Sequence, residues 1–276
     1  MSILTQYLHV IGAFQGLLLA FLLIFGSHVS TASRILGGWC LFLALGFLAQ
    51  FITMEPSVNM FSPLIGWSFF FPASYGAFLY LYCRLAISGD ALKWRDLIHF
   101  SPLLACWLLN LDFLTASAAA KVAYMSGYAP ADTHMILASK AILFLQSYGY
   151  LALSAVYIYR SQRRARRTLA NFNPDIFSWL WKVLILDLVI WILKTVGNTP
   201  VYNYTLSTLG DVLIIVLIYS IALSQWRNPK LFRIEHFSES AAAADTPDRP
   251  DPQREFASPA SVKSQGALDD GIRSSL

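Results

Sequence analysis

The stretch FSWLWKVLILDLVIWILKTV, residues 177–196, indicates the fold class of this chain. Its charged side chains are Lys182, Asp187 and Lys194, and the rest of the run is almost continuously apolar. A helix that crosses the hydrocarbon core of a bilayer needs about 20 mostly apolar residues. This stretch is therefore a predicted transmembrane helix.

Further stretches along the chain have the same character. They are Ile3–Phe25, Ala32–Ile52, Phe61–Ile87, Leu97–Leu114, Met135–Tyr159 and Tyr202–Trp226. Pro102 and Asn110 interrupt the fourth span, and Pro72 with Gly76 predicts a kink in the third. Strands of outer-membrane barrels are about ten residues long and alternate in polarity, which these runs do not. The sequence predicts an all-α, polytopic membrane bundle of seven transmembrane helices.

The composition excludes an ordinary soluble enzyme. Hydrophobic residues make up 56% of the chain and charged residues only 13%, whereas soluble domains carry roughly 25% charged residues. The cysteines Cys40, Cys83 and Cys106 lie in apolar stretches, where they read as packing residues and not as a metal site. No phosphate-binding loop, nucleophile elbow or metal-ligand motif is visible. We therefore expect no enzymatic activity and no cofactor.

The distribution of basic residues predicts the orientation in the membrane, because cytoplasmic loops are enriched in Lys and Arg. One side of the predicted bundle carries Arg34, Arg84, Lys93, Arg95, Arg160, Arg163, Arg164, Arg166, Arg167, Arg227, Lys230 and Arg233. The loops of the opposite side carry Lys121. The predicted topology therefore has the N-terminus outside and the C-terminus in the cytoplasm.

The run RSQRRARR at 160–167 is the most basic segment and is predicted to be a cytoplasmic loop. Its arginines are Arg160, Arg163, Arg164, Arg166 and Arg167. Anionic lipids attract such segments by about 1 kcal/mol per basic residue. The loop is therefore interpreted as facing lipid headgroups or an acidic cytoplasmic protein, and not nucleic acid.

A different composition begins near residue 235. Pro, Ser, Ala and Asp dominate residues 235–276, and large apolar side chains are nearly absent. Such a segment cannot bury enough apolar surface to offset its chain entropy. We predict a membrane domain over 1–234 and a disordered cytoplasmic tail over 235–276.

Four ionisable residues inside the apolar runs are the candidate site: Asp187, Asp211, Lys194 and Lys140. A charge in the centre of a span costs about 3 kcal/mol and usually faces a bundle interior or a cavity. Helical spacing places the two carboxylates at a similar depth, roughly 15 Å below the outer surface. One interpretation is a ligand site or proton-responsive switch in an outward-opening cavity. The alternative is an ion-pair network that only holds the fifth to seventh helices together.

Short patterns in a fixed order resemble a known family. They are GAFQGLLLAFLL at 12–23, RILGGWCLFLAL at 34–45, YGAFLYLYCRLAI at 75–87, KWRDLIHFSPLL at 93–104, FSWLWKVLI at 177–185 and NPKLF at 228–232. Together they look like the N-terminal membrane region of AraC-type bacterial transcription regulators. The resemblance implies a multi-helix sensory part in the bacterial inner membrane, followed in the family by a helix-turn-helix domain.

The chain departs from the family pattern at two places. Ala77 follows Gly76 where the family tends to have Gly-Pro, and a polar tail stands where the paired recognition helices are expected. We therefore expect no direct DNA binding.

Two classes of function stay open. The first is a receptor-like sensory membrane protein that passes a signal to a cytoplasmic partner and is linked to transcriptional regulation. The second is a small-molecule or ion transporter component with Asp187 and Asp211 as coupling carboxylates, although no internal repeat typical of transporters is visible. The expected partners are the lipid bilayer and a cytoplasmic protein, with a homo-oligomer as an open alternative.

Overall fold

The structure is a computed structural model that describes residues 3–27, 29–54, 66–125, 133–168, 174–197 and 204–227. The chain divides into two units, Met1–Phe237 and Ser238–Leu276. The second unit lies wholly outside the described residues, and so does the predicted tail over 235–276. The fold below is therefore that of the first unit.

The described residues form helices and contain no strand, so the all-α prediction is confirmed for this part of the chain. The α-helices are α1 (Ile3–Phe25), α2 (Thr31–Met54), α3 (Pro72–Ser88), α4 (Ser101–Leu109), α5 (Leu111–Thr115), α6 (Ala118–Met125), α7 (Thr133–Thr168), α8 (Pro174–Gly197) and α9 (Tyr204–Arg227). The 3₁₀ helices are η3 (Trp67–Phe70) and η4 (Trp94–Phe100).

Within the described residues, five helical stretches are long and apolar enough to cross a membrane. They are Thr5–Phe25, Thr31–Ile52, His134–Arg167, Pro174–Gly197 and Thr205–Ser224. Large apolar side chains also face outward, among them Phe14, Phe21 and Phe25 of α1, which are 63%, 64% and 71% exposed. Such a continuous apolar face is rare on a soluble monomer. Helix length, composition and this face together indicate a multi-pass membrane protein.

The third predicted span differs from the structure. Helix α3 begins at Pro72, because the fixed φ of proline suits the first turn and its missing N–H is not needed there. Pro72 therefore marks the junction between η3 and α3 and does not lie inside a longer α-helix, as the predicted kink required. Helix α3 has 17 residues and is preceded by η3, while residues 61–65 lie outside the described residues.

The fourth predicted span, Leu97–Leu114, is not one continuous helix. It is divided among η4, α4 and α5, with the break at Asn110. The Asn110 amide nitrogen donates to the carbonyl oxygen of Cys106 at 2.8 Å and to Oγ of Ser139 on α7 at 2.7 Å. This side chain thus stabilises the interrupted backbone and ties it to α7.

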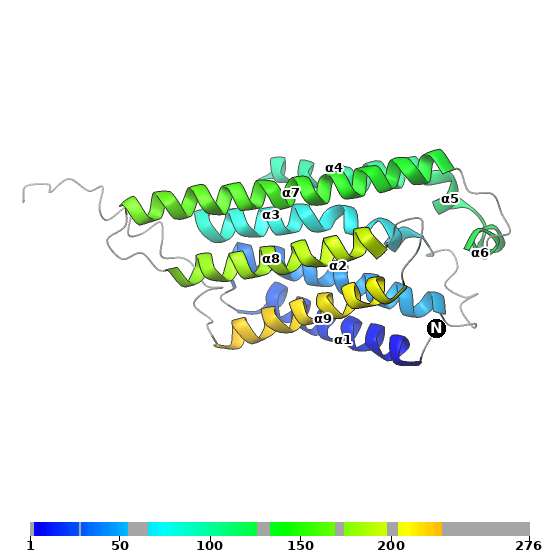
Figure 1. Ribbon diagram of the computed structural model, residues 1–276, viewed down its shortest axis with the longest axis horizontal. Helices are drawn as coiled ribbons and strands as arrows, with labels where there is room; N and C mark the ends of the chain where they lie inside the picture. Colours follow the sequence, from blue (N-terminus) through cyan, green and yellow to red (C-terminus); the bar gives the residue numbers. More distant parts are fainter. Residues whose placement is uncertain are drawn as a thin grey trace, which may run out of the picture. The chain divides into compact units, whose positions relative to one another are not determined.

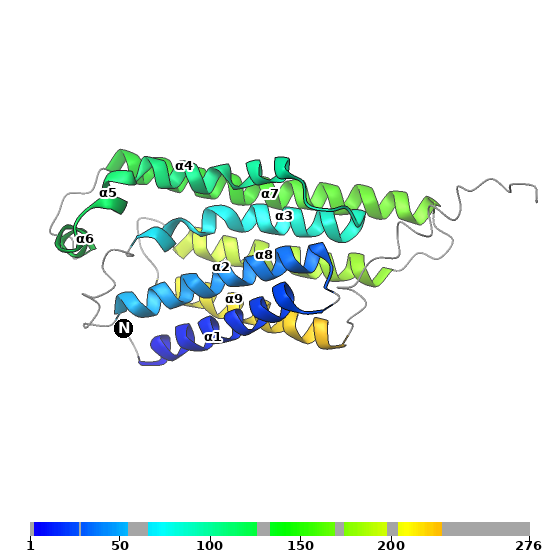
Figure 2. The same cartoon turned by 180° about the vertical axis from the view of Figure 1, so that it is seen from behind.

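The long helices pack as two layers of three. Figure 1 shows α7, α8 and α9 in the nearer layer, and Figure 2 shows α1 and α2 in front of α8 and α9 from the other side. Neighbour contacts run from α1 to α2, α3, α7, α8 and α9, and α9 returns to α1. Helix α4 packs on α3 and α7. The six long helices therefore form a closed ring around a shared interior.

Glycines allow the closest approaches in this ring. A Cβ added at Gly16 of α1 would lie 2.8 Å from the Cβ of Ala44 on α2. A Cβ added at Gly76 of α3 would lie 2.9 Å from the Cβ of Tyr150 on α7. Small residues at such crossings let membrane helices gain packing contacts over their whole length.

We expect Gly76→Ala to lower the free energy of unfolding by about 1–2 kcal/mol, because α3 and α7 must separate to accommodate the methyl group. Gly149→Ala on α7 is the matched control, since nothing lies within 4 Å of a Cβ there. Denaturant unfolding in detergent measures both variants. Equal stability of the two would contradict the close packing at Gly76.

Candidate functional site

A cavity of about 400 Å³ lies inside the ring of helices. Its walls come from α2 between Trp39 and Gln50, the C-terminal half of α8, the N-terminal parts of α3, α7 and α9, η3, and the break between α4 and α5. The size falls within the range of small-molecule sites, about 300–1,000 Å³. All four predicted site residues line it: Asp187, Asp211, Lys194 and Lys140.

Lys194 and Asp211 form an ion pair that joins α8 to α9. Lys194 Nζ lies 2.7 Å from Asp211 Oδ1 and 3.5 Å from Oγ of Ser207. A Cβ at Gly210 would lie 2.9 Å from Cε and 3.2 Å from Cδ of Lys194. The absence of a side chain at Gly210 therefore lets the apolar stem of the lysine lie along α9 and carry its ammonium group to Asp211.

Asp187 is buried on the same wall, with 3% of its surface exposed. Its Oδ2 has no hydrogen-bond partner among the described residues. Trp39 of α2 also lines the cavity and is 1% exposed. Its indole Nε1 likewise has no hydrogen-bond partner among the described residues. A buried polar group without a partner costs free energy and calls for an explanation. Two residues of the cavity wall therefore have one acceptor atom and one donor atom whose hydrogen-bonding needs the described protein does not meet, and neighbouring atoms cover both almost completely.

Lys140 is exposed at the cavity wall on α7. Within the described residues, no ion pair joins it to Asp187 or Asp211. The expected network across the fifth to seventh predicted helices thus consists of one ion pair between α8 and α9. Helix α7 is linked to α8 differently, by a 2.7 Å hydrogen bond between Tyr148 Oη and Thr195 Oγ1.

Other polar groups of the cavity wall were not identified from the sequence. Gln50 Oε1 accepts a hydrogen bond from Nε2 of His9 at 2.7 Å, and Nδ1 of His9 lies 2.6 Å from the carbonyl oxygen of Thr5. Asn110 and Ser139 bond to each other, as described above. Each of these side chains is a single polar residue in an apolar helix, so sequence alone gives no reason to prefer it over many similar ones.

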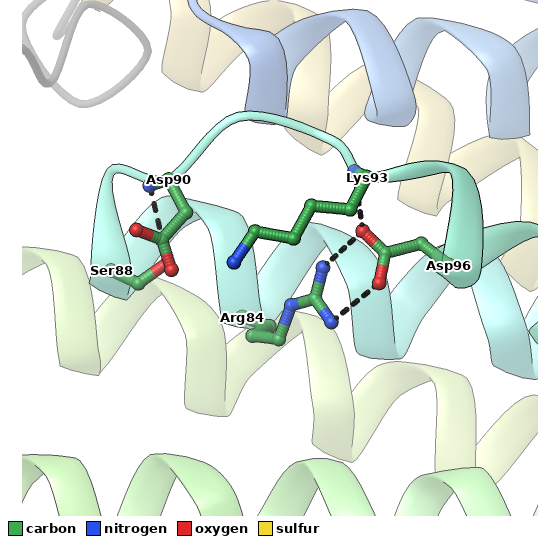
Figure 3. A network of polar contacts seen from close by, with 5 residues as sticks. All are labelled: Arg84, Ser88, Asp90, Lys93 and Asp96. Atoms are coloured by element: carbon green, nitrogen blue, oxygen red, sulfur yellow. Dashed lines mark hydrogen bonds and ion pairs between the residues drawn. The ribbon is translucent and has the colours of Figure 1, made fainter.

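A second polar cluster lies where α3 turns into η4 (Figure 3). Arg84 donates from both terminal nitrogens to the carboxylate of Asp96, at 2.9 Å and 2.6 Å. The Lys93 backbone N–H donates to the same carboxylate at 2.8 Å. Gly89, with φ of 68°, ends α3 and allows the chain to turn back. Arg84, predicted only as a topological charge, is therefore half of a bidentate ion pair.

The hydrogen bonds from Arg84 lower the pKa of Asp96 to about 2, with the Lys93 N–H acting in the same direction. A carboxyl pKa below its unfolded value of about 3.9 stabilises the fold above that value, and the effect is lost as pH falls from about 4 towards 2. We expect the difference in thermal midpoint between wild type and Asp96→Asn to shrink over this window. Asp90→Asn, at an exposed loop position, should parallel the wild type throughout. A constant difference down to pH 2.5 would contradict this.

The arginine run is not a loop. Helix α7 continues without a break to Thr168, and all five arginines are exposed on this extension. Both views show it projecting beyond the ends of α3 and α9 (Figures 1 and 2). Trp181 of α8 donates to Gln162 at 3.3 Å, so one side of the extension is held against α8. The predicted basic loop is thus a basic helix end, positioned by its neighbour.

The site gives no sign of a metal centre: the described residues contain no group of three or more His, Cys, Asp or Glu that would hold an ion. Comparisons with protein-family models, with curated proteins and with solved structures find no match. The resemblance to the membrane region of AraC-type regulators therefore stays a prediction. The function is argued below from the cavity and from α7.

Proposed function

We propose that the chain is a receptor-like sensory protein of the bacterial inner membrane that binds a small molecule in the cavity and signals to a cytoplasmic partner linked to transcription. The observation that carries the proposal is the cavity itself. It is enclosed by a ring of helices, contains buried charged groups, and has the size of a small-molecule site.

The proposed topology has seven spans. The two beyond the five stretches long and apolar enough to cross a membrane are α3 with η3, and the broken segment over Leu97–Leu114. In this arrangement the arginines of α7 and the Arg84 cluster lie at the cytoplasmic end, following the positive-inside rule. The cavity, lined by the N-terminal parts of α7 and α9 and by the C-terminal half of α8, then lies in the outer half of the bundle.

Reporter fusions test this topology. Alkaline phosphatase should be active when it is fused after Ser126 and inactive when it is fused at the C-terminus. A fluorescent protein should be dark when it is fused after Ser126 and fluorescent when it is fused at the C-terminus. Both fusions reporting one compartment would contradict the proposed number of spans.

Helix α7 is the proposed connection between the cavity and the cytoplasm. Its 36 residues correspond to about 54 Å, whereas the hydrocarbon core is about 30 Å thick. Ser139 and Lys140 line the cavity near one end, and the arginines lie at the other. A ligand shifts a conformational equilibrium only by binding one state better. A ligand that prefers one packing of α7 against α8 would therefore reposition the arginines.

The transporter alternative has one observation in its favour, the broken helix at Asn110 beside the cavity. Transporters place interrupted helices at their binding sites. The two functions predict different consequences for variants at the two ends of α7, so one experiment separates them.

The experiment compares transcript levels and solute uptake in cells with wild type, Ile214→Trp, which fills the cavity, and a variant with all five α7 arginines changed to Gln. A sensor loses the same transcript response in both variants. A transporter loses uptake with Ile214→Trp but keeps it in the arginine variant. The matched control changes the five arginines to Lys, and a C-terminal fusion verifies that the Gln variant keeps its orientation. Transcript levels equal to those of the wild type in both variants would contradict the sensory proposal.

A further inference from the structure

Some polar groups of the cavity wall have hydrogen-bond partners within the protein and others have none among the described residues. Lys194 is committed to Asp211, Asn110 to Ser139 and Gln50 to His9. The groups without a hydrogen-bond partner among the described residues are Asp187 Oδ2 and Trp39 Nε1, on walls contributed by α8 and α2. An occupant that completed the site would donate to the carboxylate and accept from the indole N–H.

The charges of the cavity wall indicate which kind of hydrogen-bond donor the occupant would present to Asp187. The Lys194–Asp211 pair is neutral as a unit, and Lys140 is exposed and not paired with either carboxylate within the described residues. Asp187 is therefore a buried carboxylate without a cation beside it. Hydrogen bonds between a cationic donor and a carboxylate are roughly twice as strong as neutral ones. A protonated amine satisfies both the charge and the lone pair.

The walls around these groups suit an amine with an apolar body. Aromatic rings of Tyr75, Phe144 and Trp191 line the same cavity. Such faces attract organic cations by about 0.5–2 kcal/mol each. Aliphatic side chains also line the cavity, including Leu43, Ile190 and Leu217. A fully hydrated inorganic ion would leave this surface unused.

We propose that the cavity binds an amphipathic organic cation, with its protonated amine on Asp187, a hydrogen-bond acceptor at Trp39 and its apolar body against the aliphatic and aromatic wall. This proposal rests on the proposed sensory function, because it names the chemical class of the molecule that the sensor would detect. It concerns binding alone and needs no chemical change of the ligand.

The test uses the purified full-length chain in detergent and measures thermal midpoint and calorimetric affinity. The probes are the amines hexylamine, 3-phenylpropylamine, tyramine and phenylalaninol, each beside the alcohol and the carboxylate with the same body. Phenylalaninol carries the amine, an acceptor hydroxyl and an apolar ring, so it should bind best. The alcohols and carboxylates should bind at least tenfold more weakly.

Variants identify the residues that bind. Asp187→Asn should reduce amine affinity on the order of 10- to 100-fold, the value of a hydrogen bond to a charged group. Asp175→Asn, an exposed aspartate at the other end of α8, should leave it unchanged. Trp39→Phe should weaken phenylalaninol but not 3-phenylpropylamine, which lacks the acceptor, and Ile214→Trp should prevent binding of both. The Trp39 comparison remains decisive if Asp187→Asn fails to fold.

Several outcomes overturn the proposal. They are binding of no amine, equal binding of amines and alcohols, unchanged affinity in Asp187→Asn, and stabilisation by sodium chloride but not by choline chloride that depends on Asp187. The last outcome would assign the site to an inorganic cation. Amine binding without any change in transcripts would refute the sensory function and leave the cation site standing.

Discussion

Asp211→Asn is expected to lower the free energy of unfolding by about 3 kcal/mol, near the lower end of the 3–5 kcal/mol seen when one partner of a buried ion pair is removed. The side chain of Asp211 is only 10% exposed, and its partner Lys194 is 21% exposed. The variant leaves the lysine ammonium without its carboxylate in an apolar bundle. The partial exposure of Lys194 allows its long stem to move the charge outward, which reduces the loss.

The double variant Asp211→Leu with Lys194→Met tests the origin of that loss. Replacing a whole buried pair by apolar residues is often neutral or stabilising, so most of the stability should return. Lys140→Met is the matched control, because this exposed lysine of the same cavity should change stability by no more than about 0.5 kcal/mol. Denaturant unfolding in detergent measures all three. An Asp211→Asn variant as stable as wild type would show that the pair contributes nothing to the bundle.

Hydropathy identified the membrane helices well and their ends less well. Helix α1 has the predicted bounds, Ile3–Phe25, because polar residues follow directly after Phe25. The fifth span was predicted to end at Tyr159, where the arginines begin, yet α7 runs to Thr168. Arg, Gln and Ala are good helix formers, so the helix continues in water after the apolar run has ended. A hydropathy limit marks the end of an apolar run and not the end of the helix.

Short or broken helices were the least predictable elements. The run over 61–87 was read as one span, but Pro72 sets the start of α3. The break at Asn110 was visible in the sequence as a weak point, whereas its bond to Ser139 depends on the packing of α4 against α7. Local sequence therefore located the irregular backbone without revealing what stabilises it.

Of the residues that line the cavity, the sequence identified only the charged ones. Ionisable residues in apolar runs are rare, and this alone pointed to Asp187, Asp211, Lys194 and Lys140. That Lys194 pairs with Asp211 depends on Gly210 and on the α8–α9 contact, which sequence spacing does not contain. Trp39 could not be recognised, because tryptophan is common in membrane proteins for reasons of interface and packing.

The second large effect on the free energy of unfolding is expected at Asp187, where the substitution should stabilise the protein instead of destabilising it. Asp187→Leu should raise the free energy of unfolding of the ligand-free protein, because the wild type buries a carboxylate whose Oδ2 has no partner among the described residues. Insertion scales separate Asp from Leu by about 3 kcal/mol at the centre of a span. Leu has the same number and branching of side-chain heavy atoms as Asp, and the adjoining cavity can take the extra volume of its methyl groups, so overpacking should not cancel the gain.

The two aspartates of one cavity thus provide a direct comparison, in which losing Asp211 destabilises and losing Asp187 stabilises. Asp187→Asn should give a smaller gain, since it removes the charge but keeps a buried polar group. Asp175→Leu, exposed in the first turn of α8, is the control for a carboxylate on the same helix. Lost stability at one residue is a recurrent cost of function, and the function proposed for Asp187 is to bind an organic cation. If Asp187→Leu instead lost stability, the carboxylate would have a stabilising partner within the protein, and the reason for placing an organic cation beside it would disappear.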